Sequence, residues 1–285
     1  MYRVEWRCRR RCSVYIHKVS ESVSTMPKVP RTRKPVKAVA EVVTTKAVRD
    51  KKNTPEKQIL ENLRKRYGDN RNAKNAVQIK QYMRGQFAYF GLKAPERRAL
   101  DKEVLAESPQ LNVYEVRHLL HLLWQESERE FQMFGIDYGA KHLKTLIGPD
   151  VKTSKESLDC VHSLIVTQSW WDTVDMLASK LVGGLVAAHP KALVPVMDEW
   201  ITDENMWTRR SAILHQLSYN ENTDKDRLFR YCLLCCHEKE FFIQKAIGWA
   251  LRNFFRYNPA AVKTFVNANK EKLAPLSVKE ALKHA

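Results

Sequence analysis

The sequence has no run of about 18 consecutive apolar residues, so we expect no membrane-spanning helix. Nine glycines and eleven prolines among 285 residues are too few for a collagen-like or low-complexity chain. The phosphate-binding patterns GxxxxGK[ST] and GxGxxG do not occur, nor do the hydrolase patterns HExxH and GxSxG. These absences exclude several common enzyme classes. They leave a chain whose 44% apolar residues are enough for a sizeable core.

The six cysteines also lack the setting of a disulfide framework or of a metal site. The N-terminal residues contain no apolar core of a secretory signal, so disulfides are not expected. Cys232 and Cys235 form one CxxC, next to Cys236 and His237, but no second pair of cysteines accompanies it. We interpret these cysteines as buried core thiols and predict no metal site.

Acidic residues are scarce at the start of the chain. Residues 1–55 contain fifteen Lys or Arg and four Asp or Glu, and so carry +11 of the net charge of +17. This segment has little apolar periodicity. We therefore predict a disordered basic extension over residues 1–54 and one folded domain over residues 55–285. A basic surplus of this size predicts attraction to a polyanion such as nucleic acid.

The extension also bears on the location of the protein in the cell. Its Arg-rich, acid-poor start is compatible with a mitochondrial transit peptide, and residues 30–37 are compatible with a nuclear import signal. The alternative is a solvated tail that contains no site. We expect an intracellular protein, in the nucleus or mitochondrion if the extension is an address and otherwise in the cytoplasm.

From Pro55 onward, apolar residues recur at helical spacing in successive segments separated by short turns rich in Pro, Asn and Asp. This pattern predicts an all-α fold, a curved α-solenoid of HEAT-like helix pairs. Trp171, Arg210 and Trp249 lie 39 residues apart, close to the period of about 40 residues in such repeats. We expect them on equivalent helices along one concave face, and coincidence is the alternative.

The segment Ser169-Trp-Trp-Asp-Thr-Val-Asp175 is the strongest candidate for chemistry. We predict Ser169 as a helix N-cap, which places Trp171 and Asp175 four residues apart on one helical face. A carboxylate there can stabilise positive charge at an anomeric carbon or orient a water, and the aromatic face attracts a cationic ligand. The alternative, which the spacing alone favours, is that the tryptophans belong to the core and the aspartates cap the helix or face solvent.

Arginine follows tryptophan by three residues at Trp207 and Arg210 and again at Trp249 and Arg252, and Lys245 precedes Trp249 by four. The planar fork of an arginine suits phosphate. The alternative is that these arginines lie over the tryptophans at the surface. Their regular recurrence favours contacts from Arg210, Lys245 and Arg252 to a DNA backbone.

Several long motifs carry a family resemblance. They are Gln81-Tyr-Met-Arg, Phe90-Gly-Leu-Lys-Ala-Pro-Glu-Arg-Arg98, and the segments 164–175, 207–217 and 239–252. Over roughly residues 55–284 the sequence resembles the bacterial DNA alkylation repair glycosylases of the AlkD type. The resemblance implies a helical HEAT-like solenoid that holds duplex DNA in its concave groove. It further implies hydrolysis of the N-glycosidic bond of cationic N3- or N7-alkylated purines.

The resemblance also implies roles for single residues. Asp175 matches the family's catalytic aspartate, and Trp171 and Trp249 match its two tryptophans that face the sugar. Arg210 matches its arginine that binds the DNA backbone.

Two further matches concern DNA contacts. Tyr82 matches a family tyrosine near the DNA, and Lys93 matches a polar residue there that is commonly glutamine. The resemblance implies neither metal nor organic cofactor. We expect a monomer whose partner is duplex DNA with alkylated bases. The alternative is a catalytically silent HEAT-repeat scaffold that binds DNA or an acidic protein.

Overall fold

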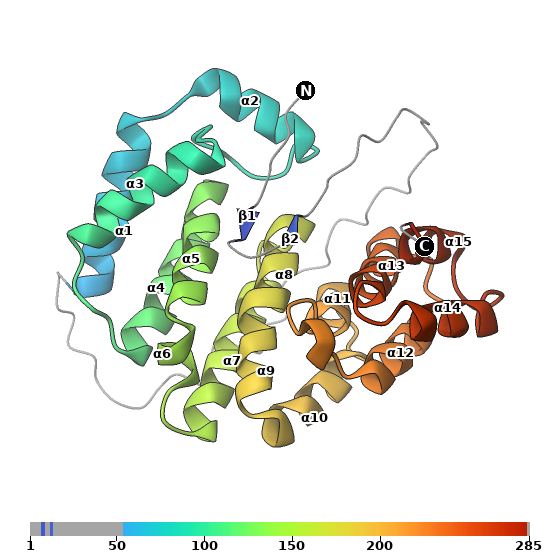
Figure 1. Cartoon of the computed structure of the whole chain (residues 1–285). Coiled ribbons are helices and arrows are strands. Elements are labelled where there is room, and N and C mark those ends of the chain that lie inside the picture. Colours follow the sequence, from blue (N-terminus) through green and yellow to red (C-terminus); the bar gives the residue numbers. More distant parts are fainter. Residues whose placement is uncertain (1–6, 9–11, 14–53, 284–285) are drawn as a thin grey trace. The chain divides into compact units, whose positions relative to one another are not determined.

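The structure, a computed structural model, describes residues 7–8, 12–13 and 54–283. Asn53–Ala285 form one compact unit by themselves. Its helices stack in chain order along a curved path (Figure 1), which confirms the prediction of an all-α solenoid. They are α1 (Pro55–Asp69), α2 (Ala73–Tyr82), α3 (Ala94–Ala106), α4 (Val113–Gln125), α5 (Arg129–Lys141), α6 (Leu143–Ile147), α7 (Val151–Ile165), α8 (Trp171–Met176), the π-helix η1 (Leu177–Val182), α9 (Gly183–Ala188), α10 (Pro190–Trp200), α11 (Met206–Leu214), the 3-10 helix η2 (Asn220–Asn222), α12 (Lys225–Leu234), α13 (Phe241–Phe255), α14 (Pro259–Ala268) and α15 (Pro275–Ala281).

The described residues before position 54 are two short strands, β1 (Arg7–Cys8) and β2 (Cys12–Ser13). They pair antiparallel, with Arg7 opposite Ser13 and Cys8 opposite Cys12. The rest of the predicted disordered extension, and any targeting signal in it, lies outside the residues that the structure describes.

Polar caps start the helices where the sequence predicts turns. Asp150, Asn205, Asp224 and Asn258 each precede a helix, and their side chains accept a hydrogen bond from a backbone N–H in its first turn. Each cap satisfies an N–H that has no partner within its helix. The predicted turns therefore coincide with the observed helix boundaries.

The N-terminus of α8 differs from its prediction. Trp170, not Ser169, is the N-cap, and the Ser169 hydroxyl donates to the carbonyl oxygen of Ile165 at 2.6 Å. The prediction of Ser169 as the cap was wrong because its hydroxyl completes the end of α7 instead.

A 39-residue interval runs through the packing of the helices. It separates Lys93, Gln132, Trp171, Arg210 and Trp249. Lys93 is the N-cap of α3, and the other four lie on α5, α8, α11 and α13, which contact one another in that succession. The interval in the sequence is thus the interval of a structural repeat.

Side-chain hydrogen bonds join α4 to α7, one repeat interval further along the chain. The Trp124 indole N–H donates to the carbonyl oxygen of Leu164 at 3.0 Å, and Arg117 donates to Glu156 at 2.9 Å. These partners lie 40 and 39 residues apart. The bonds fix neighbouring helices against one another and so set the geometry of residues that face outward from them.

Helix α8 continues through η1 into α9. The π turns begin two residues after Asp175, and π turns are frequent near functional sites. A Cβ on Gly183 would lie 2.3 Å from the carbonyl oxygen of His215, so only glycine allows α11 to approach here. The Tyr219 hydroxyl donates to the Gly183 carbonyl oxygen at 2.8 Å and holds this contact.

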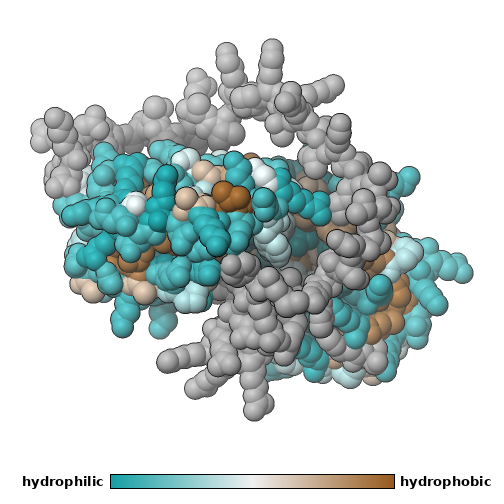
Figure 2. Space-filling view, turned by 90° about the horizontal axis from the view of Figure 1, so that it is seen from above, coloured by the Kyte–Doolittle hydropathy of each residue, from teal (hydrophilic) through white to brown (hydrophobic). Residues whose placement is uncertain are grey.

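The exposed surface is mostly polar. Figure 2 shows a largely hydrophilic face with separate hydrophobic patches. In the part of the chain that the structure describes, no helix is both long and apolar enough to cross a membrane.

Candidate active site

Asp175 lies buried on α8 and forms a double hydrogen bond with Arg210 of α11. Arg210 Nε donates to Asp175 Oδ1 at 2.7 Å, and Nη2 donates to Oδ2 at 2.8 Å. Arg210 Nη1 also donates to the carbonyl oxygen of Phe242, in the first turn of α13. A bidentate pair of this kind fixes the plane of the carboxylate as well as its position.

The electrostatics of Asp175 follow from this burial. Burial raises the pKa of Asp175 above its ordinary value, Arg210 opposes that rise, and the nearby Asp172 adds to it. The Asp175 side chain is 10% exposed to solvent. The site therefore contains a fixed, largely desolvated carboxylate that can still meet a ligand.

A second buried pair involves Asp172, three residues before Asp175 on α8. Arg129 of α5 is fully buried, and its Nε and Nη2 donate to the two oxygens of Asp172 at 3.0 and 2.7 Å. The alternative interpretation, in which Asp172 is a cap or solvent residue, is wrong because Arg129 binds its buried side chain. Two arginines from neighbouring helices thus neutralise the two aspartates of α8.

Trp171 begins α8 and is partly buried. Its ring meets that of Tyr82 edge to face, with ring centroids 6.2 Å apart. Tyr82 ends α2 and is 60% exposed. The structure thus brings together Tyr82 and Trp171, two predicted site residues 89 positions apart in the sequence.

The other tryptophans are placed differently. Trp249 is partly buried on α13 and packs against the hydrophobic core. Trp170 and Trp207 pack with Phe242, at centroid distances of 5.4 and 5.0 Å from its ring. Phe242, which these two tryptophans contact, is also the residue whose carbonyl oxygen accepts a hydrogen bond from Arg210.

Lys245 and Arg252, which we predicted as DNA-binding residues, share one acidic partner. Lys245 Nζ lies 2.7 Å from Glu280 Oε1, and Arg252 Nη1 donates to Glu280 Oε2. Burial raises the pKa of Glu280, but Lys245 and Arg252 outweigh it and hold that pKa below its ordinary value. Both cations flank Trp249 on α13, and Glu280 comes from the last helix, α15.

Lys93 is exposed at the start of α3, where its backbone N–H donates to the Glu96 carboxylate at 3.0 Å. This arrangement directs the chain into α3.

Sequence analysis did not identify Arg129, Glu280 or Phe242 as parts of the site. Their partners lie 28 to 43 residues away. Arg129 and Gln168, which lies just before α8, are 39 residues apart. This match to the repeat interval is the one signal in the sequence that links them.

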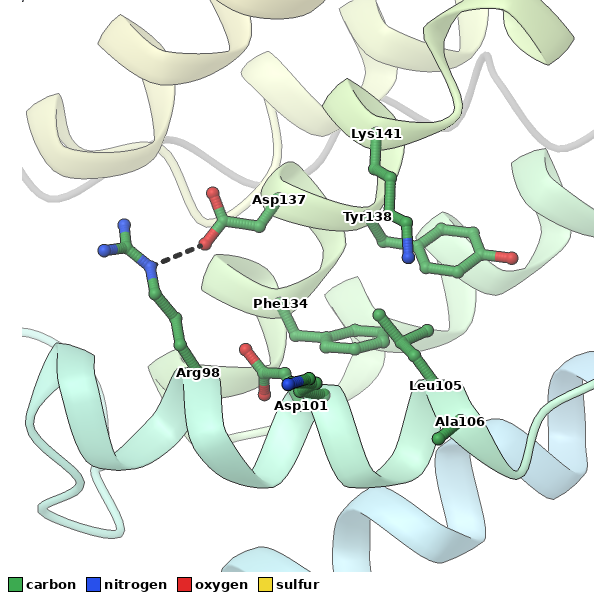
Figure 3. Close-up of a pocket in the computed structure, with 9 residues that line it drawn as sticks. Arg98, Asp101, Leu105, Ala106, Phe134, Asp137, Tyr138 and Lys141 are labelled. Atoms are coloured by element: carbon green, nitrogen blue, oxygen red, sulfur yellow. Dashed lines mark ion pairs between the residues drawn. The ribbon is translucent and has the colours of Figure 1, made fainter. Parts of the chain in front are cut away.

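A cavity of about 430 Å³ opens between α3 and α5 (Figure 3). Asp137 there faces Arg98 at 3.6 Å and also accepts from Arg97 and Lys180. Among the described residues that line this cavity, none is a predicted site residue. Its carboxylate Asp101 pairs with Arg97, and the aromatic residues Tyr82 and Trp171 are not part of its lining.

Cys232 and Cys235 are buried, as predicted, and burial raises the pKa of Cys235 to about 12. Within the described residues, no group of three or more His, Cys, Asp or Glu side chains is arranged to hold a metal ion.

Comparison with known proteins supplies a family. A family model described as DNA alkylation repair enzyme matches residues 63–285. A predicted DNA alkylation repair enzyme from Enterococcus faecalis has a similar structure, with a TM-score of 0.65 and 31% identity, over 75% of this chain and 96% of that one.

Two structures from Streptococcus mutans are similar in fold. They are smu.31 and AlkD2, each with a TM-score of 0.50, 18% identity and coverage of 65% of this chain, and 90% and 87% of their own. No curated protein matches this chain in sequence.

Proposed function

The chain belongs to the family of DNA alkylation repair enzymes, and from that premise we propose that it is a DNA glycosylase. Its substrates are cationic N3- or N7-alkylated purines in duplex DNA, which it releases by hydrolysis of the N-glycosidic bond. The observation that carries this proposal is Asp175, a carboxylate fixed by two hydrogen bonds from Arg210 and one helical turn from Trp171.

The chemistry suits a single carboxylate. A cationic alkylpurine is already a good leaving group, so its departure needs little general acid. As the bond breaks, positive charge develops on the sugar, and an ionised Asp175 stabilises that charge and orients the attacking water. The Arg210 pair supports this role because the carboxylate does not have to reorganise when the charge forms.

The aromatic residues supply binding at the same place. Trp171 is partly buried, and its ring contacts Tyr82 rather than forming part of the main core. In the proposal, Trp171 and Trp249 face the sugar, where their rings attract positive charge. Tyr82, Lys93, Lys245 and Arg252 contact the DNA around the lesion.

Arg210 combines two proposed tasks. It neutralises buried Asp175, and it contacts a phosphate with the N–H groups of Nη1 and Nη2 that neither Asp175 nor Phe242 uses. A phosphate contact positions the protein on DNA without reading its sequence.

The test is release of free base from methylated duplex DNA, quantified as 7-methylguanine and 3-methyladenine. The glycosylase proposal predicts release well above spontaneous depurination, and no release of unmodified guanine. A protein that binds the duplex without releasing either base would instead be the silent scaffold, and the proposal would be wrong.

A further inference from the structure

Arg129 is the largest side chain that the described structure buries completely. Besides Asp172, it binds the turn between α7 and α8 and the first turn of α8. Its Nη1 donates to the carbonyl oxygen of Gln168 at 2.8 Å, and its Nη2 donates to the Thr173 hydroxyl at 2.8 Å. One guanidinium from α5 therefore binds both the turn before α8 and the first turn of α8.

Backbone strain gathers around the same side chain. Gln168 has a backbone φ of 50° and Phe87 one of 61°, values that residues other than glycine adopt rarely. Both contact Arg129, since the Phe87 ring centroid lies 3.8 Å from the Arg129 Cζ. Such strain persists only where surrounding contacts fix it, and it gathers at functional sites.

These contacts link two sides of the candidate site. Phe87 belongs to the loop that follows Tyr82, and Gln168 precedes Trp171 by three residues. Arg129 thus connects the segment that carries Tyr82 with the helix that carries Trp171 and Asp175. The contact between the Tyr82 and Trp171 rings spans the same two segments.

We propose that Arg129 is a positioning residue for Asp175. It fixes the first turn of α8 and the loop after α2, and it neutralises Asp172, so that Asp175 stays ionised and faces the DNA sugar in one orientation. This inference rests on the proposed glycosylase function, but its main measurement does not depend on excision.

The charges around Asp175 define that measurement. Arg210 of α11 and Asp172 of α8 act on the Asp175 carboxylate directly. Arg129 of α5 faces Asp172, and so does the buried Tyr89 hydroxyl, whose pKa is raised by burial and by Asp172. Tyr89 is therefore neutral, and Arg129 is the cation that binds Asp172 beside Asp175.

Asp172→Asn and Arg129→Met should therefore have opposite effects. Asp172→Asn removes a negative charge and leaves Arg129 in place, which lowers the pKa of Asp175. Arg129→Met leaves the charge of Asp172 uncompensated, which raises the pKa of Asp175. The probe is the carboxyl carbon signal of Asp175 in aspartate-labelled protein, assigned by its loss in Asp175→Asn and followed during a pH titration.

Arg97→Met is the matched control. Arg97 is also buried, at 2% exposure, and donates to Asp101 at 2.6 Å and Asp137 at 2.7 Å. Its loss also breaks a buried ion network, but Arg97, Asp101 and Asp137 are not among the charged groups that shift the pKa of Asp175. The titration midpoint of Asp175 should remain at the wild-type value in this variant.

Single-turnover excision tests the positioning itself. Arg129→Met should lower the saturating rate by about tenfold or more with little change in DNA affinity, as expected for an interaction used in the transition state. Arg129→Lys should restore the titration midpoint of Asp175, because it restores the charge. It should restore the rate only in part, because a lysine lacks the planar fork.

Two results would overturn the inference. One is an Asp175 midpoint that stays at the wild-type value in both Asp172→Asn and Arg129→Met, and the other is a folded Arg129→Met that excises at the wild-type rate. If the wild-type protein releases no alkylpurine, the glycosylase proposal fails, while the titration still decides whether Arg129 controls Asp175.

Discussion

The carboxylate of Asp175 and the guanidinium of Arg210 neutralise one another inside the protein. Removing one partner of such a buried pair commonly costs about 3–5 kcal/mol of stability, because the other charge remains without compensation. Since burial raises the pKa of Asp175, this carboxylate loses its charge at a higher pH than an ordinary aspartate as the solution is acidified. Activity that needs the ionised form should fall over the same pH range.

Arg210→Ala should shift this acid limb, the pH range in which activity falls on acidification, to higher pH. Without Arg210, nothing opposes the effects of burial and Asp172, so Asp175 takes up a proton at a higher pH than in the wild type. The measurement is the single-turnover excision rate between pH 5 and 9 for wild type, Arg210→Ala and Arg210→Lys. Arg210→Lys should lie between the other two, and an acid limb at the wild-type pH in Arg210→Ala would contradict the role of the pair.

The same variant tests the phosphate contact that the sequence predicts for Arg210. Loss of one phosphate contact should weaken binding uniformly across sequences and reduce the slope of log K against log salt by about one unit. The slope is separate from the pH profile, so the two tasks of Arg210 can be distinguished.

At the scale of the element, helix α15 matters because it brings Glu280 to α13. Gly248 of α13 permits this approach, since a Cβ there would lie 2.5 Å from the Cβ of Glu280. Glu280 neutralises Lys245 and Arg252, the two cations on either side of Trp249. In the proposed DNA complex, this carboxylate would compete with DNA phosphate for both cations.

Glu280→Gln should therefore strengthen DNA binding at low salt and steepen the salt dependence by up to about two units, one for each released cation. Fluorescence anisotropy with a duplex at several salt concentrations measures this. Glu103→Gln is the control, because Glu103 of α3 forms a surface ion pair with Arg66 of α1, far along the chain from α13. An unchanged salt slope in Glu280→Gln would show that Lys245 and Arg252 do not face DNA.

The elements themselves were largely predictable from the sequence. Helical periodicity and the short turns rich in Pro, Asn and Asp indicated most helix boundaries, because these signals are local. The π turns of η1 and the cap at Trp170 were not predictable, since they depend on contacts with α11 and α7.

The candidate site shows the same division. The proximity of Trp171 and Asp175 follows from a spacing of four residues. The pairs of Arg129 with Asp172 and of Glu280 with Lys245 join different helices, and charge alone does not determine which acid meets which base. The sequence therefore identified side chains suited to the chemistry, while their partners required the tertiary structure.

At the scale of the whole molecule, charge is distributed unevenly along the chain. About two-thirds of the net charge of +17 lies in residues 1–55, before the matched family region begins at residue 63. Several cations of the helical unit are also neutralised by buried acids, including Arg129 and Arg210. We therefore expect the N-terminal segment to add non-specific affinity for DNA without taking part in the chemistry.

Deletion of residues 1–54 should lower DNA affinity chiefly at low salt, where charges are weakly screened, and should leave the saturating single-turnover rate unchanged. The measurement is excision rate against enzyme concentration at two salt concentrations, for the full chain and the truncated chain. Loss of the saturating rate on truncation would mean that the segment reaches the active site.

The most direct test of the account is Asp175→Asn in single-turnover excision of 7-methylguanine from duplex DNA, with DNA affinity measured in parallel. The account predicts that the rate falls by at least about 100-fold, because the charge that stabilises the transition state is lost. Affinity should be kept or increased, because the variant removes a negative charge that faces an anionic ligand. A folded Asp175→Asn protein that excises at the wild-type rate would contradict the account.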